Sequence, residues 1–197
     1  FTFEEDGSFV EDFTQYIDDI DEDVLTLTVT GNENITVSID GFGVTFGAVQ
    51  DWNGTETLTF TVNDNQGRAI AEDNIDVIVT PVNDAPVITS TADSTATEDA
   101  SYSYTITASD VDGDALTYAA PTTPSWLSFN ASTHVLSGTP LNANVGDTTV
   151  VLTVTDNGEG TLQDSQTFTI TVTNTNDTPV LDLISDPSAV LEDGGNI

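Results

Sequence analysis

Residues 57–64 read Thr-Leu-Thr-Phe-Thr-Val-Asn-Asp, so apolar and polar side chains alternate until an acidic turn begins. Residues 150–156, Val-Val-Leu-Thr-Val-Thr-Asp, repeat this alternation in the second half of the chain. A period of two carried by β-branched and aromatic residues is typical of a strand with one buried face. The pattern recurs around residues 25–29, 102–106 and 168–172, with Asn, Asp and Gly clusters between the runs. Because no segment shows a helical period, the sequence predicts an all-β fold.

A repeated unit organises these strands. The segment Val82–Val87, Val-Asn-Asp-Ala-Pro-Val, matches Thr175–Val180, Thr-Asn-Asp-Thr-Pro-Val, at an offset of 93 positions. Three further matches occur at offsets of 91 to 93: Glu5-Asp6 with Glu98-Asp99, Asp19–Thr26 with Asp110–Thr117, and Val62–Asn65 with Val154–Asn157. Ordered landmarks at a nearly constant offset indicate tandem copies of one structural unit.

The repeat also predicts the domain boundaries. We expect a first β-sandwich in residues 1–84 and a second in residues 85–177, each near the size of about 100 residues that such domains have. Residues 178–197 are expected to form the first strand of a third copy, since Glu192-Asp193 repeats the Glu-Asp landmark. About a dozen residues precede this landmark in the second copy, so the first copy is expected to lack its opening strand.

The charge balance excludes several classes of function. The chain has 34 Asp and Glu residues against one Lys or Arg, a formal net charge of −33. Such a chain cannot neutralise phosphates, so we expect no nucleic-acid partner and no binding to an anionic membrane. The absence of Lys and Cys excludes Schiff-base chemistry, a P-loop lysine, thiolate nucleophiles and disulfides. No apolar run approaches the length of a membrane span, so direct membrane insertion is not expected.

The acidic residues gather in short clusters at strand ends and in the linker between the copies. Calcium takes six to eight oxygen ligands from carboxylates, amide oxygens and backbone carbonyls. An Asp-x-Asp pair in a bent loop, such as Asp110 and Asp112, places two carboxylates near one point, and Asn83-Asp84 adds an amide and a carboxylate. We therefore predict a calcium site. An EF-hand is a poor alternative, because the twelfth position of the loop that begins at Asp110 is Pro121, where Glu is required.

Two other interpretations of the acids compete with a metal site. A solvated acidic surface, of the kind that suits high salt, accounts for the net charge but not for the repeated position of the clusters. A glycosidase would need its carboxylate pair in one cleft, whereas these pairs lie in repeats and linkers. The single His, His134, has no nucleophile motif beside it. The sequence therefore predicts a protein that is not an enzyme.

Several segments resemble those of tandem bacterial cadherin-like domains, which are immunoglobulin-like repeats of large surface or secreted adhesins. The linker Asn83–Pro86 resembles the cadherin interdomain linker, and Ser109–Asp114 resembles the cadherin Asp-x-Asp loop. Pro124–Phe129, followed by Leu136–Pro140, resembles the signature of the dystroglycan-type branch. Asp51–Thr55 resembles a motif common in neighbouring bacterial repeats. The resemblance covers essentially the whole chain.

This resemblance implies two tandem immunoglobulin-like, cadherin-like Greek-key β-sandwiches with Ca²⁺ between them. In the family, the upstream domain, the linker and the downstream domain all supply ligands to the ions at one junction. Carried onto this chain, the implied ligands are Glu5, Asp51, Asn53, Asn83, Asp84, Asp110, Asp112 and Asp156. The corresponding junction to a third repeat would use Glu98, Asn176 and Asp177, but the second copy lacks an acidic pair near residues 143–145.

The expected function is a calcium-binding structural or adhesive module of a large bacterial cell-surface or secreted protein, and therefore an extracellular one. Calcium is expected to convert a self-repelling hinge into a rigid junction, with neighbouring cadherin-like repeats as partners. The alternative is a calcium-dependent module that binds surface glycans or a partner protein. We also expect head-to-tail self-association, in which the strand Val180–Ile184, the counterpart of Val87–Thr91, completes the first copy of another molecule.

Overall fold

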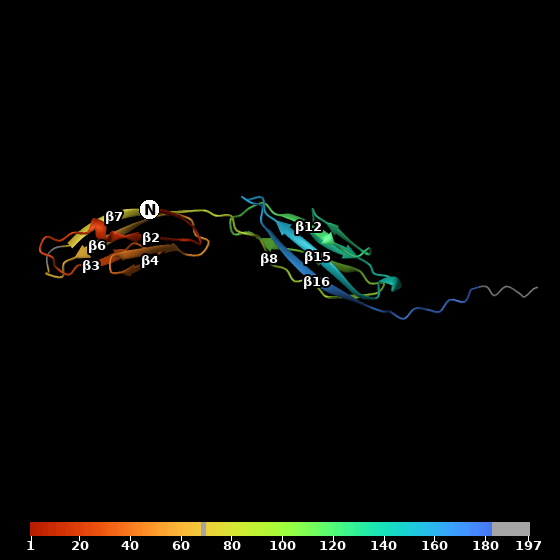
Figure 1. The fold of residues 1–197 in the computed structure, drawn as a ribbon. Coiled ribbons are helices and arrows are strands. Elements are labelled where there is room, and N and C mark those ends of the chain that lie inside the picture. The colour runs from red at the N-terminus through yellow and green to blue at the C-terminus, as the bar shows by residue number, and fades with distance from the viewer. Residues whose placement is uncertain (68–69, 183–197) are drawn as a thin grey trace, which may run out of the picture.

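A computed structural model of the chain describes residues 1–67 and 70–182, and it places two β-sandwiches end to end (Figure 1). The first sandwich contains seven strands: β1 Thr2–Glu4, β2 Ser8–Asp12, β3 Thr26–Thr30, β4 Ile35–Asp40, β5 Gly43–Ala48, β6 Gly54–Asn63 and β7 Ile70–Thr80. One sheet has the order β1-β7-β6-β3 and the other has the order β2-β5-β4. A short 3-10 turn, η1 at Phe13–Tyr16, follows β2.

The second sandwich repeats this arrangement. Its strands are β8 Val87–Ile88, β9 Thr95–Thr97, β10 Tyr102–Thr105, β11 Ala108–Ser109, β12 Thr117–Thr122, β13 Leu127–Asn130, β14 Val135–Gly138, β15 Gly146–Thr155 and β16 Gln163–Thr173, with a 3-10 turn η2 at Asn142–Asn144. The sheet β12-β15-β16-β9 faces the sheet β10-β14-β13, and β11 pairs separately with β8. No described helix is long and apolar enough to span a membrane.

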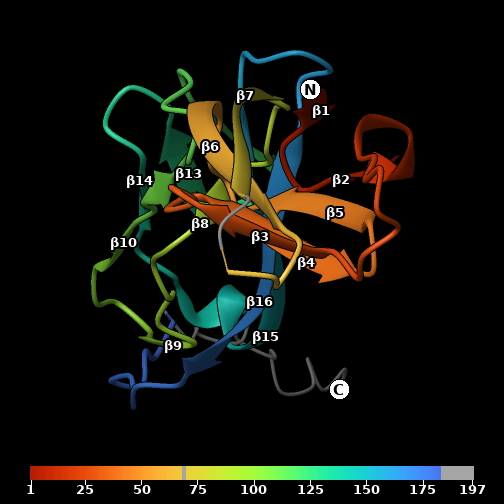
Figure 2. The ribbon, with the colours of Figure 1, turned by 90° about the vertical axis from the view of Figure 1, so that its left-hand side faces the viewer.

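Alternating side chains build the two cores. On β6, Leu58 and Phe60 are buried while the threonines between and beside them are partly or fully exposed, as the period of two predicts. Each sandwich encloses a separate apolar cluster: Phe46 belongs to the first and Leu152 to the second. In both sandwiches the chain passes repeatedly between the two sheets, and Figure 2 shows the first pair of sheets from its end. The predicted all-β fold with two tandem sandwiches is confirmed.

The two sandwiches differ where each begins. In the second, β8 pairs with β11 in antiparallel register before β9 joins the larger sheet. In the first, β1 is the counterpart of β9 and pairs in parallel with β7, and η1 lies where the second sandwich has β11. Among the described residues the first sandwich has no counterpart of β8. The domain limits at 84 and 177 stay predictions, and most of the proposed third-copy strand, residues 183–197, lies outside the described residues.

Candidate metal centre

The upstream half of the centre starts at the end of β1, where the Glu5 side chain is 3% exposed. The Glu5 carboxylate accepts a hydrogen bond from the Val82 amide at 2.7 Å, so it ties the start of the linker to the first sandwich. It also accepts one from Asn53 Nδ2 at 3.2 Å, so the amide nitrogen of Asn53, and not its oxygen, faces Glu5. Such bonds to a buried carboxylate fix the direction in which the linker leaves the domain.

Three carboxylates converge beside Glu5. Oxygen atoms of Asp6, Asp51 and Asp84 all lie within 4.8 Å of one another. Asp6 and Asp51 adopt positive φ angles of 58° and 57°, a conformation that Asp tolerates better than most residues and that lets a tight turn aim its side chain. The pKa of Asp84 is raised by burial and by the negative charges of Asp51, Asp6, Asp112 and Glu5. The site therefore resists holding all of these charges unless a cation is present.

The downstream half is the loop between β11 and β12. Asp110 Oδ1 accepts hydrogen bonds from the amides of Asp112 and Asp114 at 3.0 and 3.2 Å, which curls the loop around its first carboxylate. Oxygen atoms of these three residues also lie within 4.8 Å of one another. Burial raises the pKa of Asp114, and the negative charges of Asp110, Asp156 and Asp112 raise it further. The loop thus forms a second cluster of mutually repelling carboxylates.

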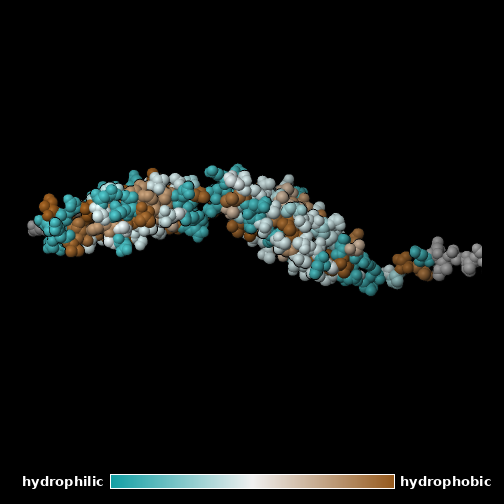
Figure 3. All heavy atoms as spheres, in the orientation of Figure 1, coloured by the Kyte–Doolittle hydropathy of each residue, from teal (hydrophilic) through white to brown (hydrophobic). Residues whose placement is uncertain are grey.

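The linker joins the two halves. The Asp84 amide donates to Asp112 Oδ2 at 2.7 Å, and Asn83 Nδ2 donates to Asp156 Oδ2 at 3.1 Å. Asp156 is 4% exposed and its other oxygen accepts from the Leu162 amide at 2.9 Å, so it is held in place from both sides. Hydrophilic side chains gather on the surface where the two sandwiches meet (Figure 3).

Two carboxylate oxygens at this junction are buried without a hydrogen-bond partner: Asp84 Oδ2 and Asp110 Oδ2. Both residues line one cavity of about 390 Å³, together with Asp51. A buried, unpartnered charged oxygen costs free energy unless a cation or another donor satisfies it. Residues 1–67 and 70–182 contain no Lys or Arg side chain that could pair with these two oxygens. Carboxylate and amide oxygens without nitrogen or sulfur ligands are the donor set of a hard cation, and the residues present fit calcium.

Sequence reasoning missed three residues of this centre. Asp6 and Asp114 belong to repeated landmarks, so their recurrence at Asp99 and in the Asp19–Asp23 loop was the available signal. Gly158 gave none. A Cβ at Gly158 would overlap Asn83 Oδ1 and Asp114 Oδ2, so only Gly lets the linker approach the loop this closely.

A half-centre of the same kind ends the second sandwich. Oxygen atoms of Glu98, Asp99 and Asp177 lie within 4.8 Å of one another. The Glu98 carboxylate accepts from the Thr175 amide at 2.9 Å, as Glu5 does from Val82. Asp99 has a φ of 60°, close to the 58° of Asp6. The upstream geometry is therefore repeated at the start of the next linker.

The family comparisons define the class of protein. Residues 85–173 match the family described as "Putative Ig domain", and residues 1–80 match the family described as "Bacterial Ig domain". Each match covers one half of the tandem, so the chain carries two immunoglobulin-like domains in series. The predicted tandem is thereby confirmed. Domains of this class are typically extracellular and non-catalytic. No curated protein sequence matches the chain.

The solved structures that match this chain are of longer chains. The extracellular domains 1–4 of Drosophila N-cadherin match 80% of this chain and 43% of theirs, with 16% identity and a TM-score of 0.47. Domains 1–5 of protocadherin gamma B2 match 78% and 34%, with 19% identity and a TM-score of 0.46. An endo-fucoidan hydrolase of glycoside hydrolase family 107 matches 79% and 24%, with 26% identity and a TM-score of 0.40. The chain thus spans less than half the length of each.

Proposed function

We propose that this tandem is a structural or adhesive module of a bacterial cell-surface or secreted protein, and that calcium bound at the linker makes its junction rigid. The observation that carries the proposal is the pair of buried, unpartnered oxygens Asp84 Oδ2 and Asp110 Oδ2 in one acid-lined cavity. One of them belongs to the linker and the other to the second sandwich. An ion that satisfied both would hold the two parts together.

The proposed ligand set has three sources. The first sandwich supplies Asp51 and Asp6, the linker supplies Asp84, and the second sandwich supplies Asp110 and Asp112. Glu5, Asn53, Asn83 and Asp156 are the remaining predicted ligands, and in the structure they hydrogen-bond to each other or to the linker. Glu5 and Asp156 therefore have a positioning role whether or not they also touch an ion.

Electrostatics explains how calcium would act on the hinge. Two unit charges about 4 Å apart interact by about 4 kcal/mol at an effective dielectric constant of about 20, so each close carboxylate pair opposes closure of the junction. A divalent cation among them converts this repulsion into attraction. The linker then has one preferred orientation, and a series of such domains becomes a rod that transmits force or holds an adhesive surface away from the cell.

Two measurements on the whole chain test this proposal. Calorimetric titration should show calcium binding with a dissociation constant in the range of about 10⁻⁴–10⁻³ M typical of extracellular modules, or tighter. Small-angle scattering should show a narrower distribution of interdomain orientations in calcium than in a chelator at equal ionic strength. Absence of binding at millimolar calcium would contradict the metal site. Binding without any change in the scattering curve would contradict the mechanical role.

A further inference from the structure

The loop between β15 and β16 carries an Asn-Gly pair, Asn157-Gly158, beside the metal centre but outside its predicted ligands. Asn157 is exposed, and its Oδ1 atom accepts a hydrogen bond from the Ala115 amide at 2.6 Å. The Gly158 amide donates a hydrogen bond to Asp156 Oδ1 at 3.2 Å. Together the two bonds have the polarity that favours attack of the Gly158 nitrogen on the Asn157 side chain.

This attack is the first step of deamidation. Gly has no side chain, so its nitrogen can approach the preceding Asn side chain without hindrance. The Gly158 nitrogen forms a bond to Asn157 Cγ, the Cγ–Nδ2 bond breaks, and the released nitrogen takes up the Gly158 proton and leaves as ammonia. Water then opens the resulting succinimide ring at one of its two carbonyls. The product is Asp or isoaspartate, in which the main chain runs through the former side chain.

The two hydrogen bonds assist opposite sides of this reaction. The Asp156 carboxylate draws on the Gly158 proton, which makes the nitrogen a better nucleophile. Asp156 is 4% exposed and its Oδ1 also accepts from the Leu162 amide, so the carboxylate is held in this position. The Ala115 amide faces the oxygen on which negative charge develops, and donors aimed at such an oxygen lower the barrier. We infer that the fold of the junction makes Asn157 a site of deamidation.

The sequence contains one other Asn-Gly pair, Asn53-Gly54, and its surroundings oppose the reaction. Asn53 Nδ2, the nitrogen that would have to leave, donates to the buried Glu5 carboxylate at 3.2 Å. Gly54 is the first residue of β6 and pairs with Val79 of β7, so the attacking nitrogen belongs to a sheet. Asn53 and Asn157 are both exposed, so access of water does not distinguish them. Asn53 is therefore a matched control within the same chain.

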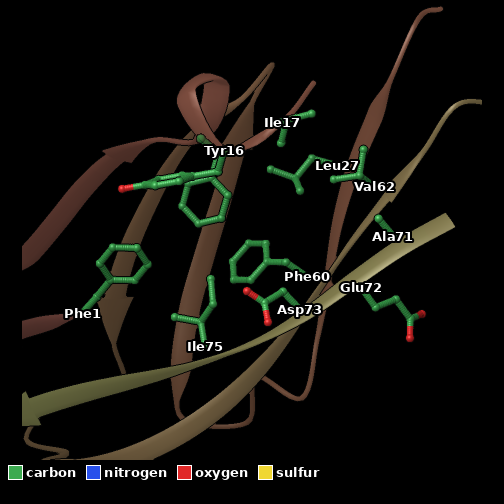
Figure 4. Close-up of a pocket in the computed structure, with 11 residues that line it drawn as sticks. Phe1, Tyr16, Ile17, Leu27, Phe60, Val62, Ala71, Glu72, Asp73 and Ile75 are labelled. Carbon is green, nitrogen blue, oxygen red and sulfur yellow. The ribbon is translucent and has the colours of Figure 1, made fainter. Parts of the chain in front are cut away.

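A third site shows that a donor to the side-chain oxygen is not sufficient. Thr59 Oγ1 donates to Asn74 Oδ1 at 2.8 Å, but the residue after Asn74 is Ile75. The Ile75 side chain lies among the apolar residues that line a cavity of the first sandwich (Figure 4). A β-branched side chain is stiff and shields its own main-chain nitrogen from the preceding residue. We expect Asn74 to stay unmodified, so its peptide serves as an internal standard.

The isoaspartate product would weaken the contact between the linker and the second sandwich. It lengthens the main chain by one carbon atom immediately before Gly158. Gly158 lies so close to Asn83 and Asp114 that even a Cβ would overlap them, so a longer main chain must push the linker away. The bond from the Asp84 amide to Asp112 Oδ2, at 2.7 Å, belongs to the same contact. Molecules that have stood longer should therefore have a looser junction.

Peptide mapping of the whole chain tests the chemistry. The protein is incubated in a chelator, folded or in concentrated urea, and mass spectrometry follows the conversion of each Asn. A donor on a developing oxyanion contributes about a hundredfold or more in enzymes, and this exposed one should make Asn157 react about tenfold faster than Asn53 in the folded protein. In urea the two rates should converge, and Asn157→Gln should remove the fast reaction. Equal rates in the folded protein, or a difference that persists in urea, would overturn the inference.

Hydrogen exchange of the Asp84 amide tests the structural effect without calcium, so its outcome does not depend on the proposed metal site. The isoaspartate form is isolated from aged protein by anion exchange and chromatography of the products. Asn157→Asp is the matched control, because it adds the same charge and leaves the main chain unchanged. We expect the Asp84 amide to exchange about tenfold faster in the isoaspartate form than in wild type or Asn157→Asp, since local opening becomes easier. Equal exchange in the isoaspartate form and Asn157→Asp would refute the effect on the linker.

Discussion

The two acidic loops of this molecule share a conformation but have different surroundings. Asp19 Oδ1 accepts hydrogen bonds from the amides two and four residues later, at 2.9 and 3.2 Å. Asp110 Oδ1 does the same at 3.0 and 3.2 Å. The repeated Asp-x-Asp sequence therefore encodes the loop shape locally, through side chain to backbone bonds of the kind that Asp forms in turns.

Among the described residues, the linker between the sandwiches contacts the second loop. Asp112 accepts from the linker amide of Asp84, and Gly158 leaves room for Asn83. Gln66 is the counterpart of Gly158 in the first sandwich, because each follows a matched Asp-Asn pair. The Nε2 atom of Gln66 donates a hydrogen bond to Asp23 Oδ1 at 3.3 Å. A metal centre of this kind thus needs a preceding domain to supply its other half. The first loop is an internal control for every test of the second.

The largest effect is expected from removing the carboxylates of the second loop. Asp110→Ala/Asp112→Ala should weaken the tightest calcium-binding step at least a hundredfold, because two ligands are lost and one of them also holds the loop closed. Asp19→Ala/Asp21→Ala removes the same residue types from the first loop and should leave that step within threefold of wild type. Calorimetric titration of both variants measures the difference. Equal losses in the two would show that the loops are equivalent.

The second effect concerns stability. A ligand that binds only the folded state stabilises it by about 0.4–1.4 kcal/mol when present at one to ten times its dissociation constant, the range that millimolar calcium reaches for the affinity expected here. Millimolar calcium should therefore raise the melting temperature of the wild type and of Asp19→Ala/Asp21→Ala, but not of Asp110→Ala/Asp112→Ala. Scanning calorimetry at matched ionic strength measures this. If sodium chloride alone produced the same rise, the acids would act as a general salt-tolerant surface.

A smaller effect is expected at Gly158. Replacing it by Ala puts a methyl group where Asn83 and Asp114 already lie, so the linker must move away from the loop. We expect calcium affinity to fall about tenfold, equivalent to about 1.4 kcal/mol. Gln66→Ala is the matched substitution in the first sandwich and should have little effect. Full affinity in Gly158→Ala would mean that the close approach of the linker is not needed.

The smallest effect is the pH dependence of the calcium-free protein. The pKa of Asp84 is raised in the folded state, so the folded protein binds this proton more tightly than the unfolded chain does. The contribution of Asp84 to the free energy of unfolding therefore increases as the pH falls through the raised pKa, until the unfolded chain also becomes protonated. Denaturation of wild type and Asp84→Asn at several pH values isolates this contribution. In calcium the sign should reverse, because protons then compete with the ion.

Much of the fold could be predicted from the sequence because its signals are local. Alternation on segments such as residues 57–64 specifies strands, since neighbouring side chains of a strand point to opposite faces. The constant repeat offset specified two copies of one domain. The acidic clusters at Asp84, Asp110 and Asp112 were found because they recur at strand ends, and the structure places Asp84 against Asp112.

Other features depend on contacts between distant parts of the chain. Nothing in the Glu5-Asp6 pair indicates which residue is buried, yet the structure turns Glu5 onto the linker amide and Asp6 towards Asp51 and Asp84. The side chain of Asn53 was predicted as an oxygen ligand, and in the structure its nitrogen faces Glu5. Which residue is buried, and which atom of its side chain faces a neighbour, depends on packing. The spacing of residues along the chain gives no information about packing.

The sequence by itself therefore determined the strands, the tandem repeat and the bent acidic loops, since each arises from neighbouring residues or from copies of them. Only the tertiary structure decided which carboxylate oxygens are buried without partners and why position 158 must be Gly. The physical reason is the same for both. Burial and close approach depend on which surfaces the folded domains bring together, and residues that meet at the junction lie as far apart as Asn83 and Asp156.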